Sequence, residues 1–236
     1  MDRMKTLMKG RRDSVLAFGI VIVAYIVMQL LVMTGNISNS LSGMLVPICA
    51  YIVMAVSLNL TVGILGELSL GHAGFMCVGA FAGALFSKCM KGSINPTLSL
   101  VIAIVIGAAA AAVFGMLIGI PVLRLRGDYL AIVTLAFGEI IKSIITNVYL
   151  GVDENGLQFS FLSNKNELAD GGVELIRGPM GVMNTQRIST FIAGFVLVLV
   201  ALVVIFNLVN SRTGRAVMAA RDNRIAAESV GISATK

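Results

Sequence analysis

Long apolar stretches alternate with short polar ones along this chain, and the apolar stretches are long enough to cross a membrane. A helix rises about 1.5 Å per residue and the hydrocarbon core of a bilayer is about 30 Å thick, so a span needs roughly 20 apolar residues. Six segments meet or approach that length: residues 15–33, 41–62, 73–87, 97–120, 129–150 and 190–209. The segment at 73–87 is the shortest and is rich in glycine, so it is the weakest of the six.

The composition agrees with this pattern. Hydrophobic residues make up 57% of the 236 residues and charged residues 13%, with a mean hydropathy of +0.93. A soluble domain of this size could not bury so much apolar surface, so the excess faces lipid. The first apolar run is too long for the core of a signal peptide, and we expect an uncleaved helix. The sequence predicts an all-α, polytopic membrane helix bundle of about six spans.

Lysine and arginine predict the orientation, because they concentrate on the cytoplasmic side. With the N-terminus inside, the cytoplasmic segments carry twelve of them and the outer loops five. We therefore expect a bundle over residues 1–210 with a cytoplasmic N-terminus, an outer loop at about 151–189 and a cytoplasmic tail at 211–236. The outer loop is interpreted either as a solvated connector or as a cap that touches an external partner. The net charge of +6 is then an orientation signal; with 6% aromatic residues and no Trp, nothing indicates nucleic-acid binding.

One polar stretch between two apolar spans has an unusual composition. Residues 63–72 contain three glycines, Glu67, Ser69 and the only histidine, but no lysine or arginine. Irregular backbone at membrane depth is tolerated only where protein or water satisfies it. Two interpretations stay open, a stretch that lines a cavity and an ordinary tight turn at the headgroups. The candidate residues for a substrate pathway are Glu67, Ser69, Gly71 and His72.

Two charged residues fall inside the fifth apolar segment. Glu139 and Lys142 lie about 15–20 Å from its start, near the middle of a bilayer. Charges there cost a few kcal/mol, so they should face a partner or a water-filled path. Their i,i+3 spacing allows them to pair on one helix face. They are interpreted either as an internally neutralised structural pair or as further residues of the substrate pathway.

Small residues recur at four-residue spacing at Gly79 and Gly83, and at Gly115 and Gly119. In lipid such positions allow helix backbones to approach closely. We expect these faces to pack against helices of this chain or of a second chain.

The tail has a helical period but is not apolar enough for lipid. Arg221, Arg224 and Glu228 fall on one stripe, with Ile225 and Val230 on the other side, and Asp222 or Asn223 could cap a second short helix. An amphipathic helix of this kind is typical of one that docks into a groove on a partner protein.

The chain contains no phosphate-binding loop, no zinc-protease motif and no assembled Ser, His and Asp set. Its three cysteines show no CxxC spacing. We therefore expect no catalytic residue, no metal site and no cofactor. A membrane enzyme that uses Glu67, Ser69 or His72 is the alternative from another functional class.

Three stretches read together resemble a known family. They cover residues 66–75 (GELSLGHAGF), 123–139 (LRLRGDYLAIVTLAFGE) and 214–231, which begins GRA and continues to RDNRIAAESVG. In order and spacing they closely resemble the permeases of branched-chain amino acid ABC transporters, specifically the LivM branch.

The resemblance implies a pore subunit of an importer in the bacterial plasma (inner) membrane. Its partners would be a second permease subunit in a heterodimer, two cytoplasmic ABC ATPase subunits and a periplasmic amino-acid-binding protein. The tail would be the coupling helix that sits in a cleft of the ATPase. By matching position, the candidate ATPase contacts are Arg221, Asp222, Arg224, Ala227, Glu228 and Gly231.

The sequence departs from the family at its end. Family members continue past the coupling helix into further spans, whereas this sequence stops at Lys236, so we expect an incomplete bundle. Two alternatives keep the architecture: an importer of urea, short amides or other amino acids, and a truncated membrane scaffold that does not transport.

Overall fold

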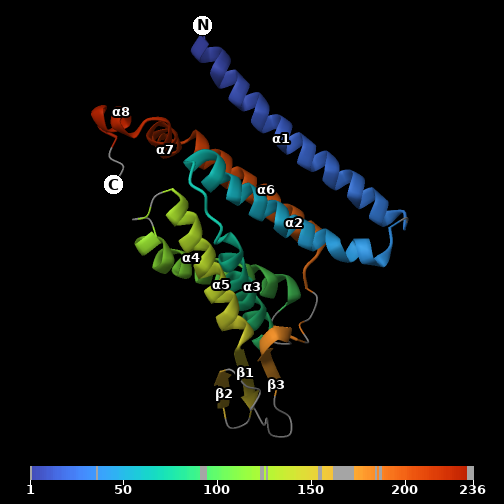
Figure 1. Cartoon of the computed structure of the whole chain (residues 1–236). Helices are drawn as coiled ribbons and strands as arrows, with labels where there is room; N and C mark the ends of the chain where they lie inside the picture. Colours follow the sequence, from blue (N-terminus) through green and yellow to red (C-terminus); the bar gives the residue numbers. More distant parts are fainter. Residues whose placement is uncertain are drawn as a thin grey trace. The chain divides into compact units, whose positions relative to one another are not determined.

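The computed structural model describes residues 2–35, 37–90, 95–122, 125, 127–153, 156–161, 173–183, 185 and 188–232. Most of these residues are helical (Figure 1). The α-helices are α1 (Asp2–Met33), α2 (Asn39–Asn59), α3 (His72–Cys89), α4 (Pro96–Val122), α5 (Asp128–Thr146), α6 (Phe191–Asn210), α7 (Arg212–Asp222) and α8 (Arg224–Ser229). A π-helical segment, η1 (Leu60–Leu65), continues α2, and a short 3-10 turn, η2 (Gly178–Met180), follows the last strand.

Five helices of the described chain are long and apolar enough to cross a membrane. They are Val15–Met33, Asn39–Leu65, Pro96–Val122, Asp128–Thr146 and Phe191–Asn210. These confirm five of the six predicted spans and the all-α membrane bundle. The sixth prediction, at 73–87, is also helical as α3, but α3 is not among the five, because its 18 residues include three glycines, His72 and Lys88.

The chain divides into two compact units, of which the first joins Met1–Gly66 to Ser189–Lys236. Its core lies where α2 meets α6, around the buried side chains of Cys49, Val198 and Leu202. A Cβ atom at Gly194 would lie 3.0 Å from the Cβ of Cys49, so glycine allows the two helices to approach closely. Cys49 is therefore a small buried hydrophobe, whereas Cys77 is half-buried and Cys89 is exposed.

The second unit, Glu67–Ile188, is built around α3, α4 and α5. Helices α3 and α4 meet through backbone: a Cβ atom at Gly107 would lie 2.6 Å from the carbonyl oxygen of Gly79, and one at Gly83 would lie 3.0 Å from that of Ala103. The predicted packing role of Gly79 and Gly83 is confirmed. Gly115 and Gly119 have open space around them in the described chain.

The same unit contains a small antiparallel sheet that the sequence analysis did not predict. Its strands are β1 (Val148–Asp153), β2 (Gly156–Phe161) and β3 (Val173–Arg177), in the order β2-β1-β3. Part of the predicted outer loop, at about 151–189, is thus folded. The alternation of apolar residues at Val148, Leu150 and Val152 was the signal for the central strand.

Candidate functional site

Helix α2 changes its hydrogen-bonding pattern before it ends. Its last turns form the π-helix η1, which stops at Gly66 in a left-handed conformation with φ of 79°. Segments of π-helix are rare and occur frequently at functional sites. Residues 67–70 then have no regular secondary structure before α3 begins at His72. The irregular backbone predicted for this stretch is present.

The tail helix α7 contacts this π-helical end. The Nη1 atom of Arg221 donates a hydrogen bond to the carbonyl oxygen of Gly63 at 2.5 Å. A Cβ atom at Gly66 would lie 3.0 Å from the Cγ, Cδ and Nε atoms of Arg221. The arginine side chain therefore lies along the last turn of η1, in the space that Gly66 leaves open.

The second unit holds the other end of the polar stretch. The backbone N–H of Leu70 donates to the Oγ1 of Thr134 on α5 at 3.1 Å, and Thr134 is buried. A Cβ atom at Gly71 would lie 2.8 Å from the carbonyl oxygen of Thr134, and one at Gly74 would lie 3.1 Å from the Cα of Gly138. The polar stretch therefore packs directly against the backbone of α5.

The predicted pathway residues differ in their burial. Gly71 is buried against Thr134, while Glu67, Ser69 and His72 are half-buried. Thr134 was missed by the sequence reasoning, although a hydroxyl within the otherwise apolar stretch at residues 130–138 was the available signal. The part that these residues play in a substrate pathway stays a prediction.

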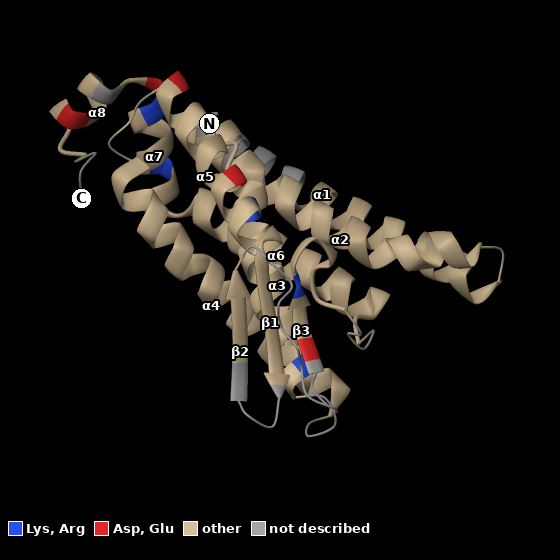
Figure 2. Cartoon of the chain, turned by 60° about the horizontal axis from the view of Figure 1, so that its bottom comes forward, with Lys and Arg blue, Asp and Glu red and all other residues tan. Residues whose placement is uncertain are grey.

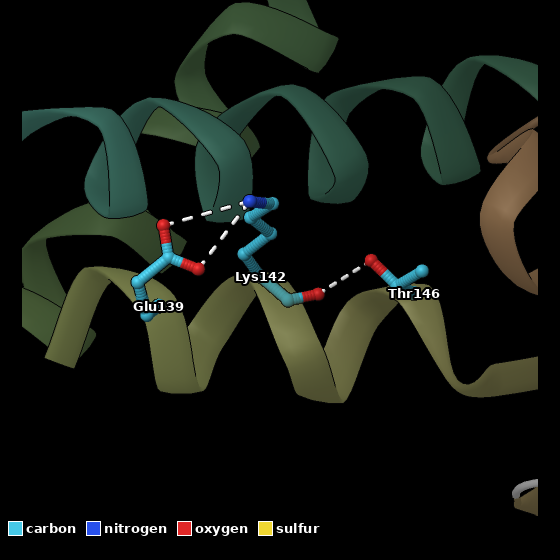
Figure 3. Close-up of polar contacts among 3 residues, drawn as sticks. All are labelled: Glu139, Lys142 and Thr146. Carbon is cyan, nitrogen blue, oxygen red and sulfur yellow. Dashed lines mark hydrogen bonds and ion pairs between the residues drawn. The ribbon is translucent and has the colours of Figure 1, made fainter. Parts of the chain in front are cut away.

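Glu139 and Lys142 form the i,i+3 ion pair that their spacing allowed (Figure 3). The Nζ of Lys142 lies 3.3 Å and 3.5 Å from the two carboxylate oxygens of Glu139. The side chain of Lys142 is 69% exposed and that of Glu139 is 65% exposed. A pair exposed on a membrane-spanning helix requires either a polar neighbour or water.

The tail forms two short helices that side chains cap. Ser211 caps α7 by accepting a hydrogen bond from the N–H of Gly214, and Asn223 caps α8 by accepting one from the N–H of Ala226. Of the two residues predicted to cap the second helix, Asn223 is the one that does so. Figure 2 shows charged residues of both signs on the segment formed by α7 and α8.

The predicted ATPase contacts fall into different environments. Asp222, Glu228 and Gly231 are exposed, Ala227 is buried, and the side chain of Arg224 lies outside the described residues. Arg221 already engages Gly63 of its own chain. Two apolar side chains on the same segment, Ile225 and Val230, are 83% and 75% exposed.

Among the side chains that the structure describes, no group of three or more His, Cys, Asp or Glu residues is arranged to hold a metal ion.

Five long apolar helices followed by a charged tail of two short, capped helices define a multi-pass membrane protein. Residues 40–236 match the family described as branched-chain amino acid transport system, permease component, and the chain belongs to that family. It is accordingly a multi-pass protein of the bacterial inner membrane.

Two curated relatives illustrate the similarity. The high-affinity branched-chain amino acid transport system permease protein LivM of Salmonella typhimurium strain LT2 is 36% identical over 196 residues, which cover 79% of this chain and 45% of the relative. The protein of the same name in Escherichia coli strain K12 is 34% identical over 193 residues, which cover 78% of this chain and 44% of the relative. The chain thus spans less than half the length of these relatives. No solved structure matches the chain significantly.

Proposed function

We propose that the chain works in the transmembrane permease subunit of an ATP-binding-cassette importer for branched-chain, hydrophobic amino acids, with ATP hydrolysis supplied by separate subunits. The observation that carries this proposal is the hydrogen bond from Arg221 on the tail to Gly63 in η1, which continues α2. It gives a helix suited to a cytoplasmic partner a direct contact with a membrane-spanning one. The family membership and the LivM relatives supply the substrate class.

The proposed partners are a second permease subunit, two ABC ATPase subunits and a periplasmic amino-acid-binding protein. In this arrangement the N-terminus is cytoplasmic, residues 1–210 form the bundle and residues 211–236 form the coupling region. The exposure of Ile225 on α8 and of Val230 directly after it supports docking of the tail, because exposed apolar side chains can be buried in a hydrophobic groove on a partner. The contacts with the ATPase would also include Asp222, Arg224 and Glu228.

The mechanism follows from the contact between the tail and η1. Closure of the ATPase subunits displaces α7 and α8, and Arg221 transmits the displacement to the last turn of η1. The irregular stretch that follows, with Glu67, Ser69, Gly71 and His72, then changes its position in the pathway. Such rocking of rigid helices between two states is the usual form of transport cycles.

Uptake in proteoliposomes tests the proposal. The chain is reconstituted with the second permease, the ATPase subunits and the binding protein, and uptake of labelled leucine is measured with and without ATP. We expect ATP-dependent uptake that excess isoleucine and valine suppress and excess urea does not. Suppression by urea or short amides would change the substrate class, and assembly without any uptake would favour the scaffold.

A further inference from the structure

The small sheet has one face of apolar side chains. In an antiparallel pair, residues that lie directly opposite share a face. Val148 lies opposite Phe161 and Leu150 opposite Phe159, and Val152 continues the same face of β1. Phe159 is 64% exposed, Phe161 48% and Val152 39%. The described chain therefore leaves two phenylalanine rings of an extramembrane sheet uncovered.

The register places these rings near the membrane. Helix α5 has 19 residues and is about 28 Å long, so it just spans a hydrocarbon core of about 30 Å. Strand β1 begins two residues after α5 ends, and a strand rises about 3.3 Å per residue. Phe161 lies beside Val148, two residues after the end of α5, and is therefore about 7 Å beyond the end of the span. Phe159 lies beside Leu150 and is therefore about 13 Å beyond it. The headgroup layer on each side of a bilayer is roughly 5–8 Å thick.

The ends of the sheet differ in chemistry. The pair farthest from α5 is Asp153 with Gly156, so an acidic residue occupies the end that faces the aqueous phase. A soluble protein that approached from outside would meet this end first. The apolar end lies beside the bilayer, and the intervening positions on β2, Gln158 and Ser160, are polar and belong to the opposite face.

Hydrogen bonds from Lys88 attach the sheet to helix α3. The Nζ of Lys88, near the end of α3, donates to the carbonyl oxygens of Glu174, Leu175 and Met183. The contacts to Glu174 and Leu175 reach strand β3 itself. They attach the sheet to a second helix of the bundle in addition to α5, so the sheet has a defined position relative to the helix ends.

We propose that the Phe161 end of this apolar sheet face is a lipid-contact surface in the headgroup layer of the outer leaflet, with Phe159 just beyond that layer. Apolar residues at membrane interfaces gain free energy by burial at the boundary between headgroups and acyl chains. The proposal goes beyond transport, since it concerns how the sheet is seated on the bilayer and requires no substrate or partner.

Single tryptophans test it, because the chain contains no Trp and each introduced indole is the only one in the protein. The full chain carrying Phe161→Trp, Phe159→Trp or Val152→Trp is reconstituted in phosphatidylcholine vesicles with lipids brominated near the carbonyls. Gln158→Trp, on the opposite face and one residue from Phe159, is the matched control. We expect quenching by the brominated lipids to be strongest for tryptophan at position 161, weaker at 159 and weakest at 152. The tryptophan of the control, at position 158, should instead be quenched by aqueous acrylamide.

Equal acrylamide quenching at positions 158, 159 and 161 would overturn the proposal, because the face would then be in water. Protection from both quenchers would also overturn it, because protein would cover the rings. A second measurement avoids a new side-chain shape: benzoylphenylalanine at position 161 is photoactivated in intact membranes. Adducts with lipid support the proposal and adducts with protein alone contradict it.

Discussion

The guanidinium of Arg221 and the carbonyl oxygen of Gly63 are joined by a hydrogen bond across 158 residues of sequence. The bond connects the tail to the π-helical end of a membrane span, where Gly66 leaves room for the arginine side chain. A hydrogen bond from a charged donor is geometrically specific, so it can transmit displacement between the two elements.

Replacing Arg221 by Ala tests this connection. A hydrogen bond from a charged donor contributes about 1.5–3 kcal/mol net, so we expect leucine uptake to fall roughly tenfold or more. Co-purification with the ATPase subunits should persist, because the lost contact lies within the chain. Arg212→Ala, an exposed arginine at the start of α7, is the control. Loss of ATPase binding in the Arg221 variant would instead support its predicted role as an ATPase contact.

Gly66→Ala should destabilise the first unit. Its φ of 79° costs a non-glycine residue about 1–2 kcal/mol, and the added Cβ would press against the Arg221 side chain. The free energy of unfolding, measured by denaturation in mixed micelles, should fall by at least that amount. Gly115→Ala is the matched control, since its Cβ meets open space within a helix. Equal stability of both variants would contradict the η1 geometry.

Gly107→Val should disrupt the contact of α3 with α4. Even the first added carbon would lie 2.6 Å from the carbonyl oxygen of Gly79, and overpacking costs about 1–3 kcal/mol. Thermal unfolding should move to lower temperature, while Gly119→Val, which has open space, should leave it nearly unchanged. A normal melting temperature for the Gly107 variant would show that the helices do not meet there.

A double variant of Glu139 and Lys142 distinguishes a structural ion pair from residues of the substrate pathway. Removing one partner leaves an unpaired charge on a span, at about 2.5–3.5 kcal/mol on insertion scales, so Glu139→Gln or Lys142→Met alone should insert poorly. The double variant should insert well, as protease protection would report. Retained uptake in the double variant identifies a structural pair, and lost uptake with normal insertion identifies pathway residues.

Ile225→Asp should weaken docking of the tail. Burial of a full isoleucine side chain contributes about 1.5–3 kcal/mol, so affinity for the ATPase subunits should fall roughly tenfold or more. The side chain is 83% exposed in the chain, so stability should not change. Thr213→Asp, exposed on α7, serves as the control. Unaltered co-purification of the Ile225→Asp variant with the ATPase subunits would show that Ile225 is not part of the docking surface.

Local chemistry predicted much of this molecule. The apolar lengths of five spans, the cap of the second tail helix and the i,i+3 pair depend on residues close in sequence, so spacing alone indicates them. Other features arise between distant segments. Gly71 packs against the backbone of Thr134, and Lys88 donates a hydrogen bond to a backbone carbonyl of β3. No sequence pattern identifies these groups as partners.

What the sequence by itself determined is which segments enter the membrane, because transfer of apolar side chains depends on composition and length. Only the tertiary structure decided that Arg221 faces Gly63 and that Phe159 and Phe161 share one exposed sheet face. The physical reason is that hydrogen bonds and strand register depend on which backbone groups meet in space. That is set by the packing of the whole unit, and one residue of slip would turn each side chain to the other face.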